Sequence, residues 1–346
     1  MKVLLRADAS VSTGAGHIIR CLSLADALTE LGASVLFVSR EQEGDLNDVI
    51  AERGFEVARL PASSAASWLE DAEQTRAVLG RIGRPDWLVV DHYGIDSRWE
   101  SALAGCVGRI MVIDDLANRA HECDLLLDQN APNPLHERYA QVLPRRTRQL
   151  LGTRYALVRP EFRGHRAAAL ARRDGRISRL LVSMGGTDPR NDTAKALDGI
   201  AVCGRDGLAA DVVVGRSNPH LAAIRAWCQG RADVQLHVQT SRMAELMTRA
   251  DLAICGGGST TWERCVLGLP AIAVIQSDDQ IAIARALEGL GAHRLLGWAA
   301  GLQAYDYGRA IAGLTADELV RMSTVSAGLC DGEGAIRVAT QLCNWE

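Results

Sequence analysis

The sequence has few aromatic residues, few prolines and no cysteine motif. Aromatic side chains make up only 4% of the 346 residues, so its cores must rely on the aliphatic residues that buried parallel strands and their covering helices favour. Nine prolines against 33 glycines suit an α/β protein with glycine turns better than a loop-rich β-sandwich. The nine cysteines, an odd number without any Cys-x-x-Cys, argue against both a disulfide framework and a zinc ribbon.

Long apolar runs and an excess of one charge are also missing. No apolar run approaches the ~18–20 residues that span a bilayer, and the first residues show no secretory signal, so we expect a cytoplasmic protein. The net charge of −4, from 42 acidic and 38 basic residues, provides no global field for nucleic acid. A small anionic ligand would therefore need local donors. Nothing in the sequence requires a cofactor or a metal.

Short apolar runs alternate with amphipathic stretches, which is typical of parallel α/β sheets. The strands predicted in the first half are Val3–Ala7, Val35–Ser39, Trp87–Asp91, Arg109–Asp114 and Leu125–Asp128. Those of the second half are Leu180–Met184, Asp211–Val214, Val234–Val238, Leu252–Cys255 and Ala271–Ile275. The pattern lapses over residues 154–178, whose arginines suggest a solvated linker. We expect two Rossmann-like domains, 1–153 and 179–346, joined by this linker.

A glycine turn follows the first predicted strand. Gly14 and Gly16 precede a helix that begins at His17, so backbone N–H groups and a helix N-terminus lie at the carboxyl edge of the sheet. The helix dipole disfavours imidazolium, which leaves His17 able to accept a proton near pH 7, and Asp8 at the strand end could orient it. The alternative is a structural turn in which His17 only caps its helix.

A second glycine turn follows the strand Leu252–Cys255. Three consecutive glycines, 256–258, lead into a helix with Ser259 as its expected N-cap. Free N–H groups and the helix dipole can hold a phosphate there without a lysine, and the missing Gly-Lys-Ser/Thr excludes a Walker P-loop. Glu263, one turn into the helix, could bind ribose hydroxyls, or it could simply compensate the helix dipole.

Polar clusters follow other predicted strands in both halves. They would face one shared cleft if the halves oppose each other, although each cluster alone is more readily explained as a cap or turn. The clusters occupy residues 91–93, 114–115, 128–130, 185–188 and 276–280. Asp114 and Asp115 lack the neighbouring ligands of a metal site.

Taken together, these motifs resemble one known family. The segments that carry the resemblance are RADAS…TGAGHIIRCLSLA, VIDDLANRAHECDLLLDQN, LLGTRYALVRPEF, SMGGTDPRNDT and AICGGGSTTWERCVLGLPAIAV. They resemble the PseG family, UDP-sugar hydrolases of pseudaminic acid biosynthesis related to the MurG-type glycosyltransferases. The resemblance covers nearly the whole chain. It implies a GT-B architecture, two Rossmann-like domains with a cleft between them and the nucleotide on the C-terminal one.

The resemblance also implies an activity and a set of site residues. The family hydrolyses UDP-2,4-diacetamido-2,4,6-trideoxy-β-L-altropyranose, with water attacking C1, inversion and no metal, on the route to flagellin glycosylation. His17 matches the catalytic base, Tyr93 a tyrosine near the sugar, and Glu263 the ribose-binding glutamate. The diphosphate-binding loop is matched by Gly257, Gly258, Ser259 and Thr260. Further expected substrate contacts are Gly14, Gly16, Arg20, Gly186, Asp279 and Gln280.

One departure and two alternatives remain. Asp279 stands where the family usually has an asparagine, which bears on the exact sugar bound. A GT-B glycosyltransferase would use the same site with an acceptor hydroxyl in place of water. A non-catalytic protein that binds a UDP-sugar would use only the glycine loop. In each case the expected partner is a small-molecule UDP-sugar, and a monomer is favoured.

Overall fold

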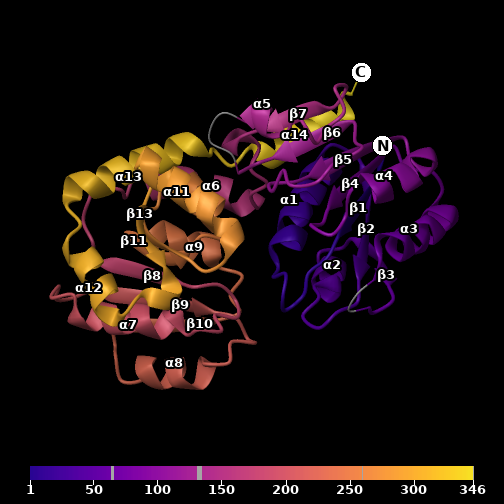
Figure 1. Ribbon diagram of the computed structural model, residues 1–346. Helices are drawn as coiled ribbons and strands as arrows, with labels where there is room; N and C mark the ends of the chain where they lie inside the picture. Colours follow the sequence, from indigo (N-terminus) through magenta and orange to yellow (C-terminus); the bar gives the residue numbers. More distant parts are fainter. Residues whose placement is uncertain (64–65, 131–134, 259, 346) are drawn as a thin grey trace. The chain divides into compact units, whose positions relative to one another are not determined.

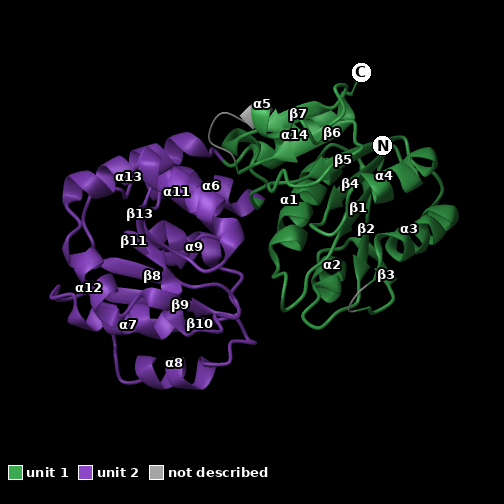
Figure 2. Cartoon of the chain, viewed as in Figure 1, with its two compact units in different colours: residues 1–159, 332–346 green, residues 160–331 purple. Residues whose placement is uncertain are grey.

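The chain forms two units, each built on one parallel sheet (Figure 1). The computed structural model describes residues 1–63, 66–130, 135–258 and 260–345. Unit 1 comprises Met1–Arg159 and Gly332–Glu346, and unit 2 comprises Pro160–Asp331 (Figure 2). The prediction of two similar-sized α/β halves is confirmed.

Unit 1 contains a seven-stranded sheet with the order β3-β2-β1-β4-β5-β6-β7. Its strands are β1 (Lys2–Ala7), β2 (Ser34–Arg40), β3 (Glu56–Leu60), β4 (Trp87–Asp91), β5 (Arg109–Ile113), β6 (Leu125–Asp128) and β7 (Arg148–Leu151). Its helices are α1 (Gly16–Glu30), α2 (Asn47–Glu52), α3 (Trp68–Ile82), α4 (Ser97–Leu103), α5 (Leu135–Arg138) and α14 (Gly334–Cys343), with short 3₁₀ turns at Ala104–Cys106 and Thr153–Tyr155. The strand order reverses between β1 and β4, and open α/β sheets bind ligands at such a switch point.

Unit 2 contains a six-stranded parallel sheet with the order β10-β9-β8-β11-β12-β13. Its strands are β8 (Arg179–Ser183), β9 (Ala209–Val214), β10 (Val234–Val238), β11 (Leu252–Gly256), β12 (Ala271–Ile275) and β13 (Arg294–Trp298). Its helices are α6 (Pro160–Leu170), α7 (Asp192–Val202), α8 (Leu221–Cys228), α9 (Met243–Arg249), α10 (Thr260–Val266), α11 (Ile281–Leu290), α12 (Ala304–Ala312) and α13 (Ala316–Leu329), with 3₁₀ turns η3 (Asp278–Gln280) and η4 (Ala299–Gly301). The switch point of this sheet lies between β8 and β11.

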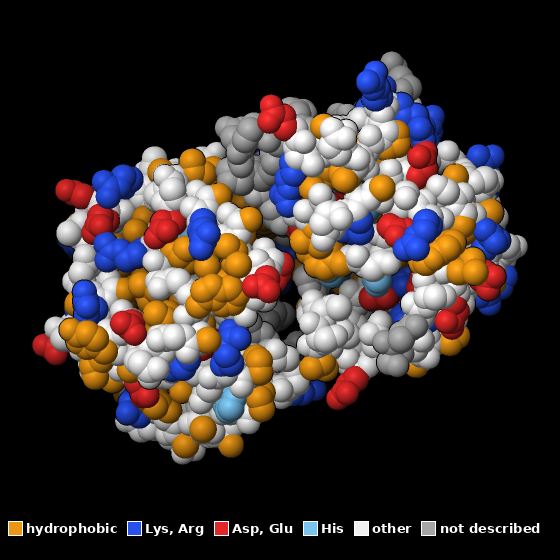
Figure 3. All heavy atoms as spheres, in the orientation of Figure 1, with side chains coloured by type: hydrophobic (Ala, Val, Ile, Leu, Met, Phe, Trp, Pro, Cys, Tyr) orange, Lys and Arg blue, Asp and Glu red, His pale blue; other side chains and the backbone are white. Residues whose placement is uncertain are grey.

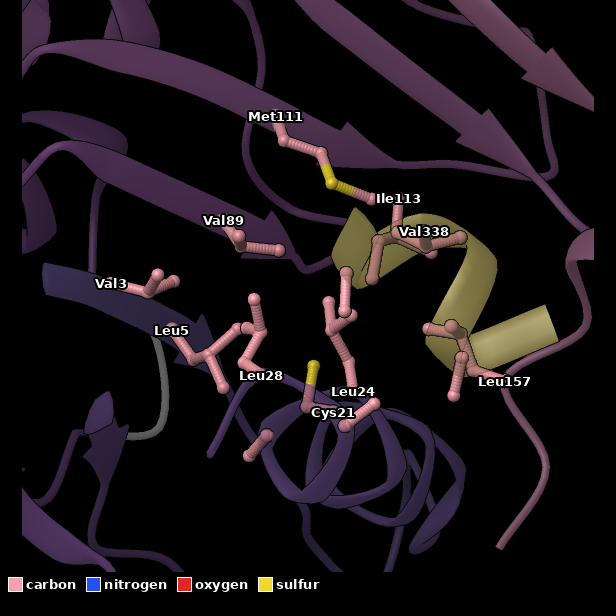
Figure 4. Close-up of a cluster of buried hydrophobic side chains, with 14 of the residues drawn as sticks. Val3, Leu5, Cys21, Leu24, Leu28, Val89, Met111, Ile113, Leu157 and Val338 are labelled. Atoms are coloured by element: carbon pink, nitrogen blue, oxygen red, sulfur yellow. The ribbon is translucent and has the colours of Figure 1, made fainter. Parts of the chain in front are cut away.

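Aliphatic side chains dominate the core of unit 1, as the composition predicts. One face of the sheet packs against α1 and α14, where Val3 and Leu5 of β1 meet Leu24 and Leu28 of α1 and Val338 of α14 (Figure 4). The other face packs against α3 and α4. Alternate side chains of β1 therefore point to two differently covered layers.

Three strands were not among those predicted, whereas the ten predicted strands are all present with ends within two residues. The additional strands β3, β7 and β13 all lie at sheet edges. Their sequences, EVARL, RQLL and RLLGW, combine apolar residues with charged ones and are only partly buried. Since one side of an edge strand faces solvent, it lacks the continuous apolar run that marks a central strand.

The segment 154–178 is not the solvated linker that the sequence predicts. The boundary between the units falls between Arg159 and Pro160, and α6 belongs to unit 2. Arg166 donates to the carbonyl groups of Val266 and Cys330. Arg173 similarly donates to the carbonyls of Leu267 and Met247 at 3.2 and 3.1 Å. These arginines therefore supply donors to carbonyl groups around helix C-termini that lack partners inside the helix.

Helix α14 also differs from its predicted place in the C-terminal domain, because it belongs to unit 1. It packs against α1, and the indole N–H of Trp87 donates to the carbonyl of Leu342 at 3.2 Å. The ring of Trp345 meets that of Trp87 edge-on at 5.0 Å between centroids, and the Arg148 guanidinium lies over Trp345 at 4.3 Å. An apolar helix face alone does not specify which of two cores it covers.

The surface carries charges of both signs. On the face drawn in Figure 3, acidic and basic side chains are interspersed over both units, in agreement with the nearly balanced composition. Within the described part of the chain, no helix is both long and apolar enough to cross a membrane.

Candidate active site

The turn after β1 brings His17 to the switch point of unit 1. Gly14 has a φ of +75°, a conformation that side-chain-bearing residues rarely adopt, and its N–H donates to the carbonyl of Ser10 at 2.9 Å. Helix α1 then begins at Gly16, one residue earlier than predicted, and its N-cap residue, Ala15, supplies no side-chain hydrogen bond. This helix terminus lacks the usual side-chain cap and suits an anionic or polar ligand.

The imidazole of His17 is held by a buried carboxylate at the end of β4. Nδ1 of His17 lies 2.6 Å from Oδ1 of Asp91. Burial by itself raises the pKa of Asp91, but the Arg20 guanidinium and His17 outweigh it and hold that pKa well below its usual range. Asp91 is therefore an anionic acceptor. The proton of a neutral His17 belongs on Nδ1, which leaves the lone pair on Nε2.

Asp8 does not orient His17, contrary to the prediction. Its carboxylate accepts hydrogen bonds from both terminal nitrogens of Arg6 and from the backbone N–H of Arg40, the last at 2.7 Å. The reason is strand alternation: Ala7 is in register with Asp91 and faces the α1 layer, whereas Arg6 and Asp8 face the opposite layer.

Tyr93 completes this group of side chains. Its ring meets the His17 ring edge-on with centroids 4.6 Å apart, and its hydroxyl donates to Oδ1 of Asp115 at 2.9 Å. Burial and the Asp115 carboxylate both raise the pKa of Tyr93 above its ordinary value. Asp115 also accepts a hydrogen bond of 2.6 Å from the Asn130 amide. The polar residues that follow β4, β5 and β6 therefore meet beside α1, as their positions at strand ends predict.

Arg20 is engaged with protein groups. Its Nε and Nη2 donate to the two carboxylate oxygens of Asp91, each at 2.6 Å, and Nη1 lies 3.3 Å from Oδ2 of Asp115. The side chain is buried. The contact with a substrate that we predicted for Arg20 remains a prediction.

The glycine loop of unit 2 is shaped by two glutamines. The predicted cap Ser259 lies outside the described residues. The N–H groups of Gly257 and Gln276 both donate to Oε1 of Gln280, at 3.2 and 3.0 Å. A Cβ on Gly256 would lie 2.0 Å from Oε1 of Gln276, so any larger residue there would require this side chain to move. The structure thus places Gln280 against the loop itself.

The remaining predicted residues of unit 2 surround the same switch point. Glu263 is buried in α10, whereas Gly258 and Asp279 are exposed, the latter in η3. Thr260 begins α10, and the Gly186 carbonyl accepts a hydrogen bond of 3.0 Å from the N–H of Gly215. Gly186 follows β8 and the glycine loop follows β11, so both lie beside the point where the strand order reverses.

Two residues of unit 1 were not assigned a role from sequence. Asp91 holds His17, and Asp115 connects Arg20 with Tyr93. One feature of the sequence points to such a shared partner: His17 and Arg20 are three residues apart and therefore lie on one face of α1. In the ranges that the structure describes, no three His, Cys, Asp or Glu side chains form a group that could hold a metal ion.

The comparisons with known proteins agree with the motifs. Residues 205–301 match the glycosyltransferase family 28 C-terminal domain. The chain is 27% identical to the UDP-2,4-diacetamido-2,4,6-trideoxy-β-L-altropyranose hydrolase of Campylobacter jejuni, over 84% of this chain and 97% of that protein. It is 24% identical to the spore coat polysaccharide biosynthesis protein SpsG of Bacillus subtilis, over 99% and 98% of the two chains. The resemblance to the hydrolases is confirmed at this level.

Other matches bear on length and fold. The chain is 25% identical to protein MJ1062 of Methanocaldococcus jannaschii over 81% of its own length, but it spans only 57% of that protein. The crystal structure of MurG from Acinetobacter baumannii superposes with a TM-score of 0.70, at 15% identity and covering 99% of both chains. The fold is that of the GT-B glycosyltransferases, as predicted.

Proposed function

We propose that this protein is an inverting hydrolase that releases UDP from UDP-2,4-diacetamido-2,4,6-trideoxy-β-L-altropyranose, in pseudaminic acid biosynthesis. The observation that carries the proposal is the buried Asp91 carboxylate, which holds Nδ1 of His17 and leaves Nε2 as the basic nitrogen at the switch point of unit 1. The similarity to the Campylobacter hydrolase over 84% of the chain supports this substrate class.

In the proposed reaction, a water oxygen forms a bond to C1 of the sugar while the bond from C1 to the β-phosphate oxygen breaks. The bonding electron pair leaves with UDP, and Nε2 of His17 takes a proton from the water. A general base of this kind contributes roughly 10²–10⁴-fold to the rate. Tyr93, edge-on to the imidazole, would contact the sugar.

The leaving group requires donors that are already in place before the bond breaks, since negative charge accumulates on the diphosphate. The loop at Gly257 and Gly258 and the start of α10 at Thr260 would supply them, with Glu263 binding the ribose. In the structure, the N–H of Gly257 already donates to Gln280. We therefore assign Gln280 to shaping the loop, with the neighbouring N–H groups facing the diphosphate. Asp279, exposed beside it, would contact the sugar.

A glycosyltransferase is the second candidate, and the family 28 match over residues 205–301 favours it. The same His17 would then deprotonate an acceptor hydroxyl instead of water. The third candidate, a protein that binds the UDP-sugar without turning it over, would leave Nε2 of His17 unused.

One assay separates the three functions. The protein is incubated with UDP-diacetamido-trideoxyhexoses without any acceptor, while UDP release is followed enzymatically and the first anomer by NMR. A hydrolase releases UDP and initially forms the anomer opposite to that of the substrate. UDP release that requires an added acceptor identifies a transferase, and binding without release identifies a binding protein.

The proposed reaction does not use a metal. We expect UDP release to proceed at the same rate after excess EDTA treatment, because the His17 base and the backbone donors require no cation. The measurement is the initial rate before and after chelation. A large loss that Mg²⁺ or Mn²⁺ restores would contradict this part of the proposal.

A further inference from the structure

We infer that Arg20 is a positioning residue: its guanidinium fixes the Asp91 carboxylate that orients His17, and it joins His17 and Tyr93 in one hydrogen-bonded network. The inference rests on the proposed function for the role of His17 as base. It differs from the substrate contact expected for Arg20 from the sequence.

The contacts of Arg20 carry the inference. Its Nε and Nη2 form a bidentate pair with Asp91, both at 2.6 Å, in a site where Asp91 is fully buried and Arg20 is 8% exposed. Oδ1 of Asp91 also lies 2.6 Å from Nδ1 of His17. One carboxylate is thus shared between a permanent cation and a titratable ring. Bidentate arginine–carboxylate pairs are strong and directional.

Several groups surround the His17 ring. Asp91 approaches it from β4, and the Tyr93 ring meets it edge-on. Arg20 and the thiol of Cys21, both on α1, lie beside the Asp91 carboxylate. Without Arg20, the Asp91 carboxylate would be a buried charge with no arginine to hold its orientation toward the ring. Nη2 of Arg20 also lies 3.2 Å from Nδ1 of His17, so the guanidinium contacts both the carboxylate and the ring.

The remaining nitrogen of the Arg20 guanidinium connects it to Tyr93 through Asp115. Nη1 lies 3.3 Å from Oδ2 of Asp115, and Oδ1 of Asp115 accepts the Tyr93 hydroxyl. The donor of Tyr93 is therefore committed to Asp115. What remains at its oxygen is an acceptor, which would suit an N–H or O–H group of a sugar. Arg20 thus connects the carboxylate that holds His17 with the carboxylate that accepts the Tyr93 hydroxyl.

The test uses the full chain with isotopically labelled histidine, and NMR reads which ring nitrogen carries the proton. The H17N variant assigns the His17 signals. In the wild type we expect the proton of the neutral ring on Nδ1. In R20M the tautomer should become mixed, because the Asp91 carboxylate is no longer held against Nδ1. R20K retains a cation but not the bidentate geometry, so its tautomer should also become mixed.

A matched control is R53M, which removes another arginine of unit 1 whose partner is the partly exposed Asp26. It should leave the His17 signals unchanged. A wild-type proton on Nε2, or an R20M tautomer identical to that of the wild type, would overturn the inference. If R20M does not fold, the same comparison is made with R20K, where a wild-type tautomer is the contrary result.

Kinetics provide the second readout. R20M and R20K should lower kcat at least tenfold with little change in KM or UDP affinity. The NMR measurement needs no turnover. Expected NMR shifts without hydrolysis of any UDP-sugar would therefore reject the proposed function while the effect of Arg20 on His17 stands.

Discussion

Among single residues, the buried aspartates of unit 1 differ in the cations that approach them. Asp71 binds the guanidinium groups of Arg6 and Arg40, which outweigh burial and lower its pKa to about 2. Asp128 is also fully buried, but the nearest nitrogen of Arg138 lies at 3.3 Å on a side chain that is 35% exposed. Burial therefore dominates and raises the pKa of Asp128 to about 6. Similar carboxylates thus have opposite effects on stability at neutral pH.

Replacing the proposed base should separate turnover from binding. In H17N, UDP release should fall by roughly 10²-fold or more, because the amide cannot accept the proton of water. UDP affinity, measured by calorimetry, should stay unchanged. His165→Asn, in α6 of unit 2, is the matched control and should retain activity. Undiminished UDP release by H17N would reject His17 as the base.

Substituting Asp128 should change how stability depends on pH. Between about pH 4 and pH 6 the carboxyl is protonated in the folded chain but ionised in the unfolded chain, so folding stability decreases as pH rises through this window. D128N does not titrate, and Tyr139 can redirect its hydroxyl to the carbonyl of Asp114, 2.9 Å away. Relative to the wild type, D128N should therefore gain about 2 kcal/mol between pH 4 and pH 7.

The measurement is urea unfolding at pH values across that range. Asp48→Asn is the control, since the Asp48 side chain is 83% exposed. The free energy of unfolding of Asp48→Asn should differ from that of the wild type by the same amount at every pH. A flat difference for D128N as well would show that Asp128 titrates normally in the folded chain.

The sequence predicts the turns of the candidate site better than its side-chain pairings. The positions of His17 and of the glycines follow from strand, turn and helix order, which are local properties. The partner of His17 depends on which way the strand-end carboxylates point, and Asp8 and Asp91 look equivalent without the register of β1 against β4. Gln280 likewise contacts the glycine loop across the ends of two neighbouring strands.

Among whole elements, helix α14 contributes to a core far away in sequence. Leu342 is 1% exposed and belongs to the same cluster as Leu24 and Leu28 of α1. The sequence itself predicts a helix over 333–343, which matches α14, because an apolar helix face is a local pattern. Its assignment to the second domain failed, because amphipathicity does not identify a partner.

Truncating one side chain of α14 should therefore destabilise unit 1. Leu342→Ala should lower the free energy of unfolding of unit 1 by about 2–5 kcal/mol, the usual range for a fully buried leucine. The neighbouring Gln341 is exposed, so Gln341→Ala is the matched control and should have little effect. Urea unfolding followed by fluorescence measures both variants. Equal stability of the two would contradict the packing of α14 on this core.

At the scale of the whole molecule, each unit has its own sheet, core and switch point. The proposed nucleotide contacts belong to unit 2, whereas the proposed base belongs to unit 1. UDP at about 100 times its Kd should raise the free energy of unfolding of unit 2 by about 2.7 kcal/mol. Differential scanning calorimetry of the full chain, with and without UDP, measures this. Stabilisation by UDP of unit 1 alone would contradict the assignment of the nucleotide to unit 2.

All of unit 2 lies before α14 in the chain, which affects how the protein folds while it is being synthesised. A ribosome produces the first strands and helices of unit 1, then all of unit 2, and only then the helix that covers α1. Multidomain chains generally fold from the N-terminus as they emerge. Here the first unit would stay incomplete, with part of its apolar surface uncovered, until after the second could fold. The apolar surface that α14 covers is therefore the last part of the unit 1 core to be buried as the chain is made.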